Sequence, residues 1–230
     1  IASALALRPE DDCAHALAGD LYMQERRWQE AVAAYDRATR LRHDNAAWWN
    51  RLGRAYLAAG NTQGAEAAFH TALELGRNAL AESKDQHAWR ELALTYRALG
   101  LYREALEAYH QALAQGDDAA ETYRGLGLVY RYLGQVTEAL SAYEKAYVAS
   151  PDDPVLQIEW GDLYREIGEA EQAAQHYQQA IELAPCRAEP YLALGQMSLA
   201  RGDIEQARSW LQRSVLLCPD DAAAQLQLGT

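Results

Sequence analysis

The segment 124–134, Arg-Gly-Leu-Gly-Leu-Val-Tyr-Arg-Tyr-Leu-Gly, decides the fold of this chain. Its small and apolar residues predict a short helix that ends at Gly134, because glycine commonly closes a helix in a left-handed conformation. A second apolar pattern runs through Ala139 and Tyr143 and stops at Pro151, where a helix cannot easily continue. The stretch therefore predicts two short helices joined by a glycine turn.

The same two-helix pattern recurs along the chain. Small residues equivalent to Gly127 stand at intervals of 34, 40, 34, 34 and 34 residues, at Gly19, Gly53, Ala93, Gly127, Gly161 and Gly195. Three residues later, all units but the last carry tyrosine, at Tyr22, Tyr56, Tyr96, Tyr130 and Tyr164. Twelve residues later, every unit carries alanine, at Ala31, Ala65, Ala105, Ala139, Ala173 and Ala207. Small residues let paired helices approach closely, and each pair must stack on its neighbours to bury enough apolar surface.

These positions resemble the signature of the tetratricopeptide repeat family. The match includes the period of 34 residues, the pair Leu126-Gly127, the tyrosine and the alanine described above, a later aromatic residue such as Tyr143, and a closing proline such as Pro151. The resemblance covers nearly the whole chain. It implies an all-α fold, a right-handed α-solenoid of antiparallel helix pairs with six full repeats and a partial repeat at each end.

The register of the repeat predicts the organisation of the chain. We expect full repeats at 12–45, 46–85, 86–119, 120–153, 154–187 and 188–221. On the same register, 1–11 is the tail of a preceding repeat and 222–230 the start of a seventh, so we expect the chain to be part of a longer protein. The alternative is that both ends are natural and frayed.

Two places depart from the regular pattern. The second repeat has 40 residues, and its extension at 76–85 predicts a lengthened helix or an added turn. Arg26 stands where the other five full repeats have a turn glycine, at Gly60, Gly100, Gly134, Gly168 and Gly202. Arg26 must therefore either adopt a left-handed conformation at a cost or alter its turn.

Acidic residues outnumber basic ones in this chain. The 230 residues include 33 Asp and Glu but 21 Lys and Arg, which gives a formal net charge of −12. This balance disfavours generic binding to nucleic acid or to a membrane surface. No apolar run reaches the roughly 18 residues of a membrane-spanning helix. Cys13, Cys186 and Cys218 lack metal or redox spacing, which favours free thiols in a cytoplasmic protein, and scarce lysine suggests a bacterial source.

Motifs for catalysis or cofactor binding are not found in the sequence. The six histidines fall at scattered repeat positions and form no His-x-x-x-His pair. Glycines with a clear role lie at helix contacts or turns, so no phosphate-binding loop is present. We therefore expect no enzyme activity, no metal and no cofactor, although an active site assembled from distant repeats stays an alternative.

The resemblance also implies a concave groove, because the first helices of tetratricopeptide repeats line the surface on which partner peptides usually lie. The positions that face this groove repeatedly carry arginine, and the C-terminal end becomes apolar. The predicted peptide-binding residues are Asn50, Arg51, Arg54, Arg90, Arg97, Arg124, Arg131, Arg165, Ile158, Leu192 and Leu199. The arginines are expected to converge on the middle of one concavity.

Arginine suits carboxylates because its planar guanidinium binds them through two hydrogen bonds. We therefore predict that the groove binds an acidic or carboxylate-bearing segment of a partner protein. The alternative is that the arginines form solvated helix faces and pair with nearby acids such as Glu91, Glu159 and Asp162. The lysine–asparagine clamp of chaperone-binding members of the family is absent, because Ala16 and Asp20 occupy the first-repeat positions.

The favoured function is a non-catalytic protein–protein interaction scaffold. One alternative is a sensor or regulatory arm of a larger signalling protein, whose ATPase, kinase or protease domain lies outside this chain. A second is single-stranded RNA binding through the arginines, which the net charge of −12 disfavours. The sequence leaves the oligomeric state open.

Overall fold

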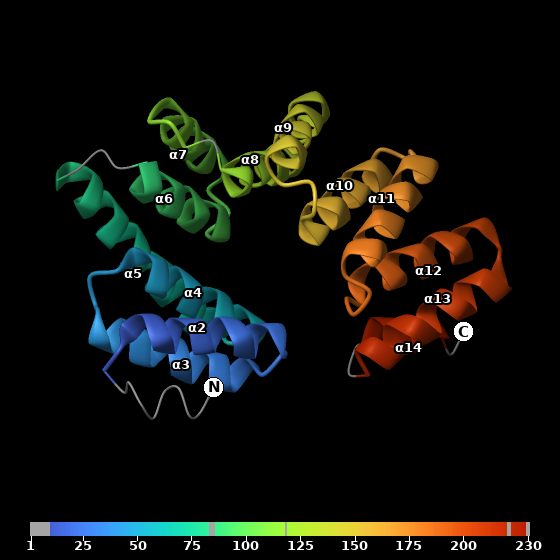
Figure 1. The fold of residues 1–230 in the computed structure, drawn as a ribbon, viewed down its shortest axis with the longest axis horizontal. Coiled ribbons are helices and arrows are strands. Elements are labelled where there is room, and N and C mark those ends of the chain that lie inside the picture. The colour runs from blue at the N-terminus through green and yellow to red at the C-terminus, as the bar shows by residue number, and fades with distance from the viewer. Residues whose placement is uncertain (1–9, 83–85, 118, 220–221, 229–230) are drawn as a thin grey trace. The chain divides into compact units, whose positions relative to one another are not determined.

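The computed structural model describes residues 10–82, 86–117, 119–219 and 222–228, and every regular element in these ranges is an α-helix (Figure 1). The chain divides into two compact units, Ile1–Asp118 and Ala119–Thr230. Within the described ranges, no helix combines the length and the apolar composition that crossing a membrane requires.

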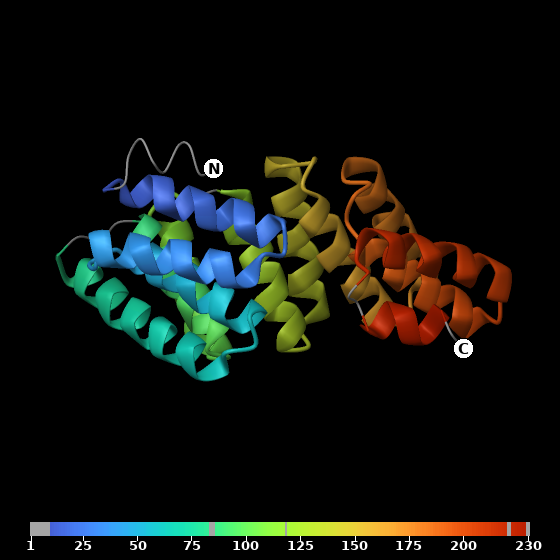
Figure 2. The same ribbon diagram turned by 90° about the horizontal axis from the view of Figure 1, so that it is seen from below.

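Both units are built from antiparallel helix pairs. The helices of unit 1 are α2 (Asp12–Gln24), α3 (Trp28–Leu41), α4 (Ala46–Ala58), α5 (Thr62–Glu82), α6 (Gln86–Ala98) and α7 (Tyr102–Ala114). Those of unit 2 are α8 (Ala120–Tyr132), α9 (Val136–Ala149), α10 (Pro154–Glu166), α11 (Ala170–Leu183), α12 (Glu189–Arg201), α13 (Ile204–Leu217) and α14 (Ala222–Leu228). Helices α2 and α3 lie side by side in both views (Figure 1, Figure 2), and each following pair packs in the same way. This arrangement confirms the predicted all-α fold of stacked helix pairs.

Small residues and aromatic rings meet inside each pair. A Cβ atom on Gly53 would lie 2.6 Å from the ring of Phe69, so α4 and α5 can approach this closely only because position 53 has no side chain. The repeated alanines are buried as well, and Ala65 is 1% exposed. Glycine, alanine and ring therefore fit together as one layer of the core, which explains why they recur at a constant spacing in the sequence.

The turn within each pair uses a left-handed residue. The glycines there have φ between 73° and 85°, at Gly60, Gly100, Gly134, Gly168 and Gly202. Arg26 adopts the same conformation with φ of 57°, so the turn is kept and the arginine carries the backbone strain.

Helix α5 has 21 residues and is the longest of the described helices. Its last residues, 76–82, belong to the extension expected at 76–85, while 83–85 lie outside the described residues. The guanidinium of Arg77 donates to the Tyr96 hydroxyl at 3.1 Å, which ties the end of α5 to α6. Of the partial repeats expected at the ends, 1–9 and 229–230 also lie outside the described residues, and α14 falls within 222–230.

Candidate binding pocket

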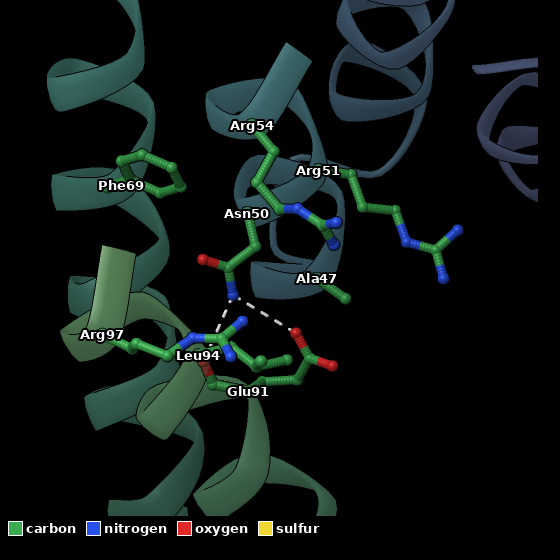
Figure 3. Close-up of a pocket in the computed structure, with 8 residues that line it drawn as sticks. All are labelled: Ala47, Asn50, Arg51, Arg54, Phe69, Glu91, Leu94 and Arg97. Carbon is green, nitrogen blue, oxygen red and sulfur yellow. Dashed lines mark hydrogen bonds between the residues drawn. The ribbon is translucent and has the colours of Figure 1, made fainter. Parts of the chain in front are cut away.

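A pocket of about 130 Å³ opens in unit 1 between α4 and α6 (Figure 3). It is lined by Ala47, Asn50, Arg51, Arg54, Phe69, Glu91, Leu94 and Arg97. Four of these were predicted as peptide-binding residues, namely Asn50, Arg51, Arg54 and Arg97. The structure therefore brings together part of the predicted set, and it adds Glu91 and an apolar wall that the sequence did not assign to a site.

The Asn50 side chain joins α4 to α6 and is only 5% exposed. Its Nδ2 donates to the backbone oxygen of Glu91 and to Glu91 Oε2, both at 3.2 Å. Its Oδ1 accepts a hydrogen bond of 2.8 Å from Thr95 Oγ1. These contacts engage both the nitrogen and the oxygen of the Asn50 amide. The hydrogen bond from Nδ2 also orients the Glu91 carboxylate at the pocket.

The arginines at the pocket differ in their surroundings. Arg51 pairs with Asp20 at 2.5 Å and its guanidinium lies 5.1 Å from the centre of the Trp48 ring. Figure 3 shows the Arg54 and Arg97 side chains extending toward Asn50, whereas the Arg51 side chain points away from it. Arg54 is exposed and Arg97 is half-buried. Within the ranges that the structure describes, the Arg97 side chain makes no hydrogen bond or ion pair.

The pocket coincides with a local change in a recurring side-chain pair. In two helix pairs, α2–α3 and α10–α11, tyrosine donates to an aspartate 15 residues earlier in the chain: Tyr35 to Asp20 and Tyr177 to Asp162, both at 2.7 Å. At the equivalent places in the second pair of unit 1, the residues are Arg54 and Phe69. Phenylalanine has no hydroxyl to offer, and an arginine replaces the aspartate. This pocket therefore has an arginine and a phenylalanine ring where those two helix pairs have an aspartate and a tyrosine.

Arg90 lies on α6 but does not line the pocket. Its guanidinium donates to Asp117, which is buried, with an Nη1–Oδ1 distance of 3.3 Å. This contact ties α6 to the end of unit 1, so the role of Arg90 seen in the structure is an internal ion pair.

The predicted arginines of unit 2 are also paired with acids. Arg124 contacts Asp153 and Glu159, each at 3.3 Å. Arg131 contacts Glu166 at 2.6 Å and Asp162 at 3.5 Å. Two of these acids, Glu159 and Asp162, are those that the alternative interpretation named as partners. In unit 2 the geometry therefore favours ion-paired helix faces.

The pKa values of Arg131 and Arg165 reflect both the burial of these side chains and the groups that they contact. Burial alone lowers the pKa of Arg131, but the hydrogen bond to Glu166 and the charges of Asp162 and Glu166 outweigh it and raise the pKa above its usual value. Arg165 behaves in the same way: its Nε donates to the Tyr177 hydroxyl at 3.2 Å, and this bond helps to raise the pKa of Arg165. These two guanidinium groups therefore carry their positive charge at neutral pH.

Comparison with protein-family models identifies the repeat. A tetratricopeptide repeat model matches residues 16–82 and 90–154, which together cover more than half of the chain. A TPR repeat model matches 161–199 and a further tetratricopeptide repeat model matches 188–221. The chain belongs to the tetratricopeptide repeat family. No curated protein sequence matches it.

Solved tetratricopeptide structures share the fold at low sequence identity. A tetratricopeptide repeat protein from Parabacteroides merdae is 18% identical with a TM-score of 0.68, and the match covers 99% of this chain and 88% of that one. YrrB, described as a TPR protein with an unusual peptide-binding site, is 18% identical with a TM-score of 0.51. The match covers 100% of this chain and 97% of YrrB. A chain of the APC/C hetero-tetramer Cut9–Hcn1 is 17% identical with a TM-score of 0.65. The match covers 99% of the present chain but only 44% of that one. At these identities the likeness shows the fold alone.

The apolar residues predicted for the tetratricopeptide groove lie in unit 2. Ile158 packs against the core cluster that contains Ala173 and Tyr177, so part of its surface serves the fold. Leu192 and Leu199 are half-buried on α12. Because the predicted residues are divided between the two units, their convergence on one groove stays a prediction.

The described residues also contain one group of metal-type donors, Asp11, Asp12 and Cys13, whose donor atoms lie within 4.8 Å of one another. Asp11 accepts from the backbone N–H of Ala14 and caps α2. Asp12 accepts from Trp48 Nε1 at 2.9 Å and pairs with Arg42. These contacts give both carboxylates a structural role at the start of α2.

Proposed function

We propose that this chain is a non-catalytic protein-interaction module whose pocket between α4 and α6 holds an acidic or carboxylate-bearing segment of a partner protein. The observation that carries the proposal is that Arg54 and Arg97 line the same pocket from two neighbouring helices, α4 and α6 (Figure 3). A carboxylate placed there meets guanidinium donors from both α4 and α6.

The surroundings of Arg97 make a carboxylate ligand favourable. A half-buried guanidinium has lost part of its hydration, and in the described part of the chain Arg97 makes no internal ion pair in exchange. A ligand carboxylate supplies that pair, and hydrogen bonds between charged groups are roughly twice as strong as neutral ones. Arg51, Arg90, Arg124 and Arg131 already have acidic partners, so binding a ligand there requires that an internal contact first be broken.

The size of the pocket indicates what part of the partner enters it. Its volume of about 130 Å³ is well below the roughly 300–1,000 Å³ of sites that enclose a whole small molecule. One side chain fits inside, while the rest of an extended segment runs over the surface outside. This matches peptide recognition better than it matches binding of a free metabolite.

The proposal includes the cytoplasmic location and bacterial source that the composition suggests. The three cysteines are free thiols, two of them exposed, which suits a reducing compartment. The peptide-binding site in the description of YrrB is a property of that protein, and it encourages a search for peptides here without specifying where they bind.

A selection from a displayed library of random peptides tests this function. The bait is the full chain, compared with the double variant Arg54→Gln/Arg97→Gln and with the charge-matched control Arg103→Gln/Arg208→Gln, whose exposed residues lie outside the pocket. Circular dichroism verifies that all three fold. We expect the wild-type chain and the control to enrich peptides rich in aspartate and glutamate, and the pocket variant to lose that enrichment. Equal enrichment by all three baits would overturn the proposal.

A further inference from the structure

An exposed leucine lies beside the pocket on α4. Leu57 is 47% exposed and follows the pocket residue Arg54 by one turn of the helix. At the equivalent place in two other helix pairs, Met23 and Leu199 are half-buried, and Met23 packs against a core cluster. Leu57 therefore presents apolar surface next to the pocket, and a ligand that covers this surface is stabilised by removing it from water.

The hydrogen bonds of Asn50 fix how α4 and α6 lie against each other. The Asn50 amide contacts Glu91 and Thr95, so residue 50 lies level with the stretch of α6 between these two. The two helices run in the same direction, because two reversals of the chain separate them. Leu57 follows Asn50 by seven residues, which is about two helical turns. Leu57 therefore lies level with a point just beyond Arg97.

A second leucine lies on the other side of Arg97. Leu94 lines the pocket, is half-buried, and precedes Arg97 by three residues, which is nearly one turn of α6. The order along the pocket is therefore Leu94, Arg97 and Leu57. The arginine at which we place the ligand carboxylate thus has an aliphatic side chain on each side of it.

An extended peptide can contact all three residues at once. Its side chains point alternately to opposite faces, so every second side chain faces the protein, at a repeat of about 6.6 Å. That repeat is close to one helical turn of about 5.4 Å, which is the scale on which the two leucines are spaced from Arg97. An acidic side chain that pairs with Arg97 therefore brings the side chains two residues before and after it toward Leu94 and Leu57.

We propose that the segment bound at this pocket carries an acidic side chain with an aliphatic side chain two residues before it and another two residues after it. This inference rests on the proposed function of the pocket and specifies its ligand further. The carboxylate pairs with Arg97, and the aliphatic side chains cover Leu94 and Leu57. Charge attracts acidic segments in general, whereas the two apolar contacts select among them.

Fluorescence anisotropy with short labelled peptides tests the inference on the full chain. Three acetylated and amidated peptides share a serine–glycine background and differ at three alternate positions. These positions carry leucine, glutamate and leucine in the first peptide, alanine, glutamate and alanine in the second, and leucine, glutamine and leucine in the third. The chain is compared with Leu57→Ala and with the conservative variant Leu57→Met. The control is Leu216→Ala, at a leucine of α13 that is 68% exposed.

The wild-type chain should bind the leucine-flanked glutamate peptide on the order of ten-fold more tightly than the alanine-flanked one, from about three-fold for each leucine contact. Leu57→Ala should lower this preference to about three-fold, because one of the two contacts is lost. Leu57→Met and Leu216→Ala should keep the preference of the wild-type chain. Circular dichroism verifies that all four proteins fold.

The peptides separate failure of the inference from failure of the proposed function. If the wild-type chain binds both glutamate peptides equally, or if Leu57→Ala leaves their ratio unchanged, the inference is wrong while the pocket still binds carboxylates. The inference is also wrong if Leu216→Ala lowers the preference as much as Leu57→Ala does. If the glutamine peptide binds as tightly as its glutamate counterpart, or if no peptide binds at millimolar concentration, the proposed function fails and the inference fails with it.

Discussion

The hydroxyl of Tyr177 donates a hydrogen bond of 2.7 Å to Oδ1 of Asp162. Asp162 also lies within 3.5 Å of guanidinium nitrogens of both Arg131 and Arg165. One carboxylate therefore joins two helix pairs of unit 2, because Arg131 lies on α8 and the others on α10 and α11. Burial and this hydrogen bond both raise the pKa of Tyr177.

Replacing Tyr177 by phenylalanine removes this bond while keeping the ring. We expect the free energy of unfolding to fall by about 1 kcal/mol, the usual net contribution of a hydrogen bond, with a somewhat larger loss because the acceptor is charged. Urea unfolding followed by tryptophan fluorescence measures the change. The ring itself fits, since Phe69 occupies the equivalent place in unit 1. An unchanged free energy of unfolding would show that the hydrogen bond to Asp162 makes no net contribution to stability.

The turn at Arg26 offers a test of backbone strain. Arg26→Gly should raise the free energy of unfolding by about 0.5–1 kcal/mol, because glycine adopts positive φ without the steric cost that other residues incur. The reverse change, Gly134→Ala, places a Cβ where no atom lies within 4 Å, so only the backbone conformation is penalised. We expect it to destabilise by about 1–2 kcal/mol. If both substitutions were neutral, the left-handed turn would not be strained.

His176 predicts how stability responds to mild acid. Its ring stacks on Trp160 and Tyr164, with centroids 4.5 and 5.3 Å away, and its Nδ1 donates to Gln157 Oε1 at 2.7 Å. Burial lowers the pKa of His176 below its usual value. As the pH falls, the imidazole of residue 176 is therefore protonated in the unfolded chain before it is protonated in the folded protein. The free energy of unfolding that this histidine contributes is fully present above about pH 6.5, and it is lost as the pH falls toward the folded-state pKa.

The measurement compares urea midpoints at pH 7.5 and 5.5. The non-titrating variant His176→Asn should lose less stability between these values than the wild-type chain loses. His43→Asn, at an exposed histidine, serves as the control and should behave like the wild-type chain. A loss of the same size in all three proteins would assign the pH dependence to other groups.

Several features of the fold follow from the sequence because they depend on local spacing. The contact between Gly53 and Phe69, the turn glycines and the buried alanines each involve residues of a single helix pair. Each of these features therefore recurs at a regular spacing in the sequence. The repeat boundaries remain predictions. The division of the chain into two units after Asp118 could not be predicted in this way, because the interval from Ala93 to Gly127 is the regular 34 residues.

The candidate site was only partly predictable, because it depends on contacts between side chains far apart in sequence. Asn50 is engaged by Thr95, 45 residues away, and Arg131 by Glu166, 35 residues away. Spacing places these residues on neighbouring helices but does not determine which rotamers meet. One signal for the pocket was present in the sequence: Phe69 is the chain's single phenylalanine, at a place where four other repeats have tyrosine.

The ion pairs of the unit 2 arginines disfavour the binding of RNA. Each phosphate would have to displace an acid such as Glu159 or Glu166 from its arginine, and the chain carries a net charge of −12. We expect no binding of arbitrary single-stranded RNA at physiological salt. Filter binding at several salt concentrations measures this, and a tight complex that weakens steeply with added salt would support the RNA alternative instead.

The central claim is that Arg97, and not the paired arginines of unit 2, binds the carboxylate of a partner segment. The most direct measurement is the affinity of an acidic peptide, selected as described above, for the wild-type chain, Arg97→Gln and Arg131→Gln. We expect Arg97→Gln to weaken binding by about ten-fold or more with little loss of stability, since one charge-assisted hydrogen bond contributes about 1.5–3 kcal/mol. Arg131→Gln should lower the stability and leave the affinity of the folded protein nearly unchanged. Full affinity in Arg97→Gln, with binding lost in folded Arg131→Gln, would contradict the account.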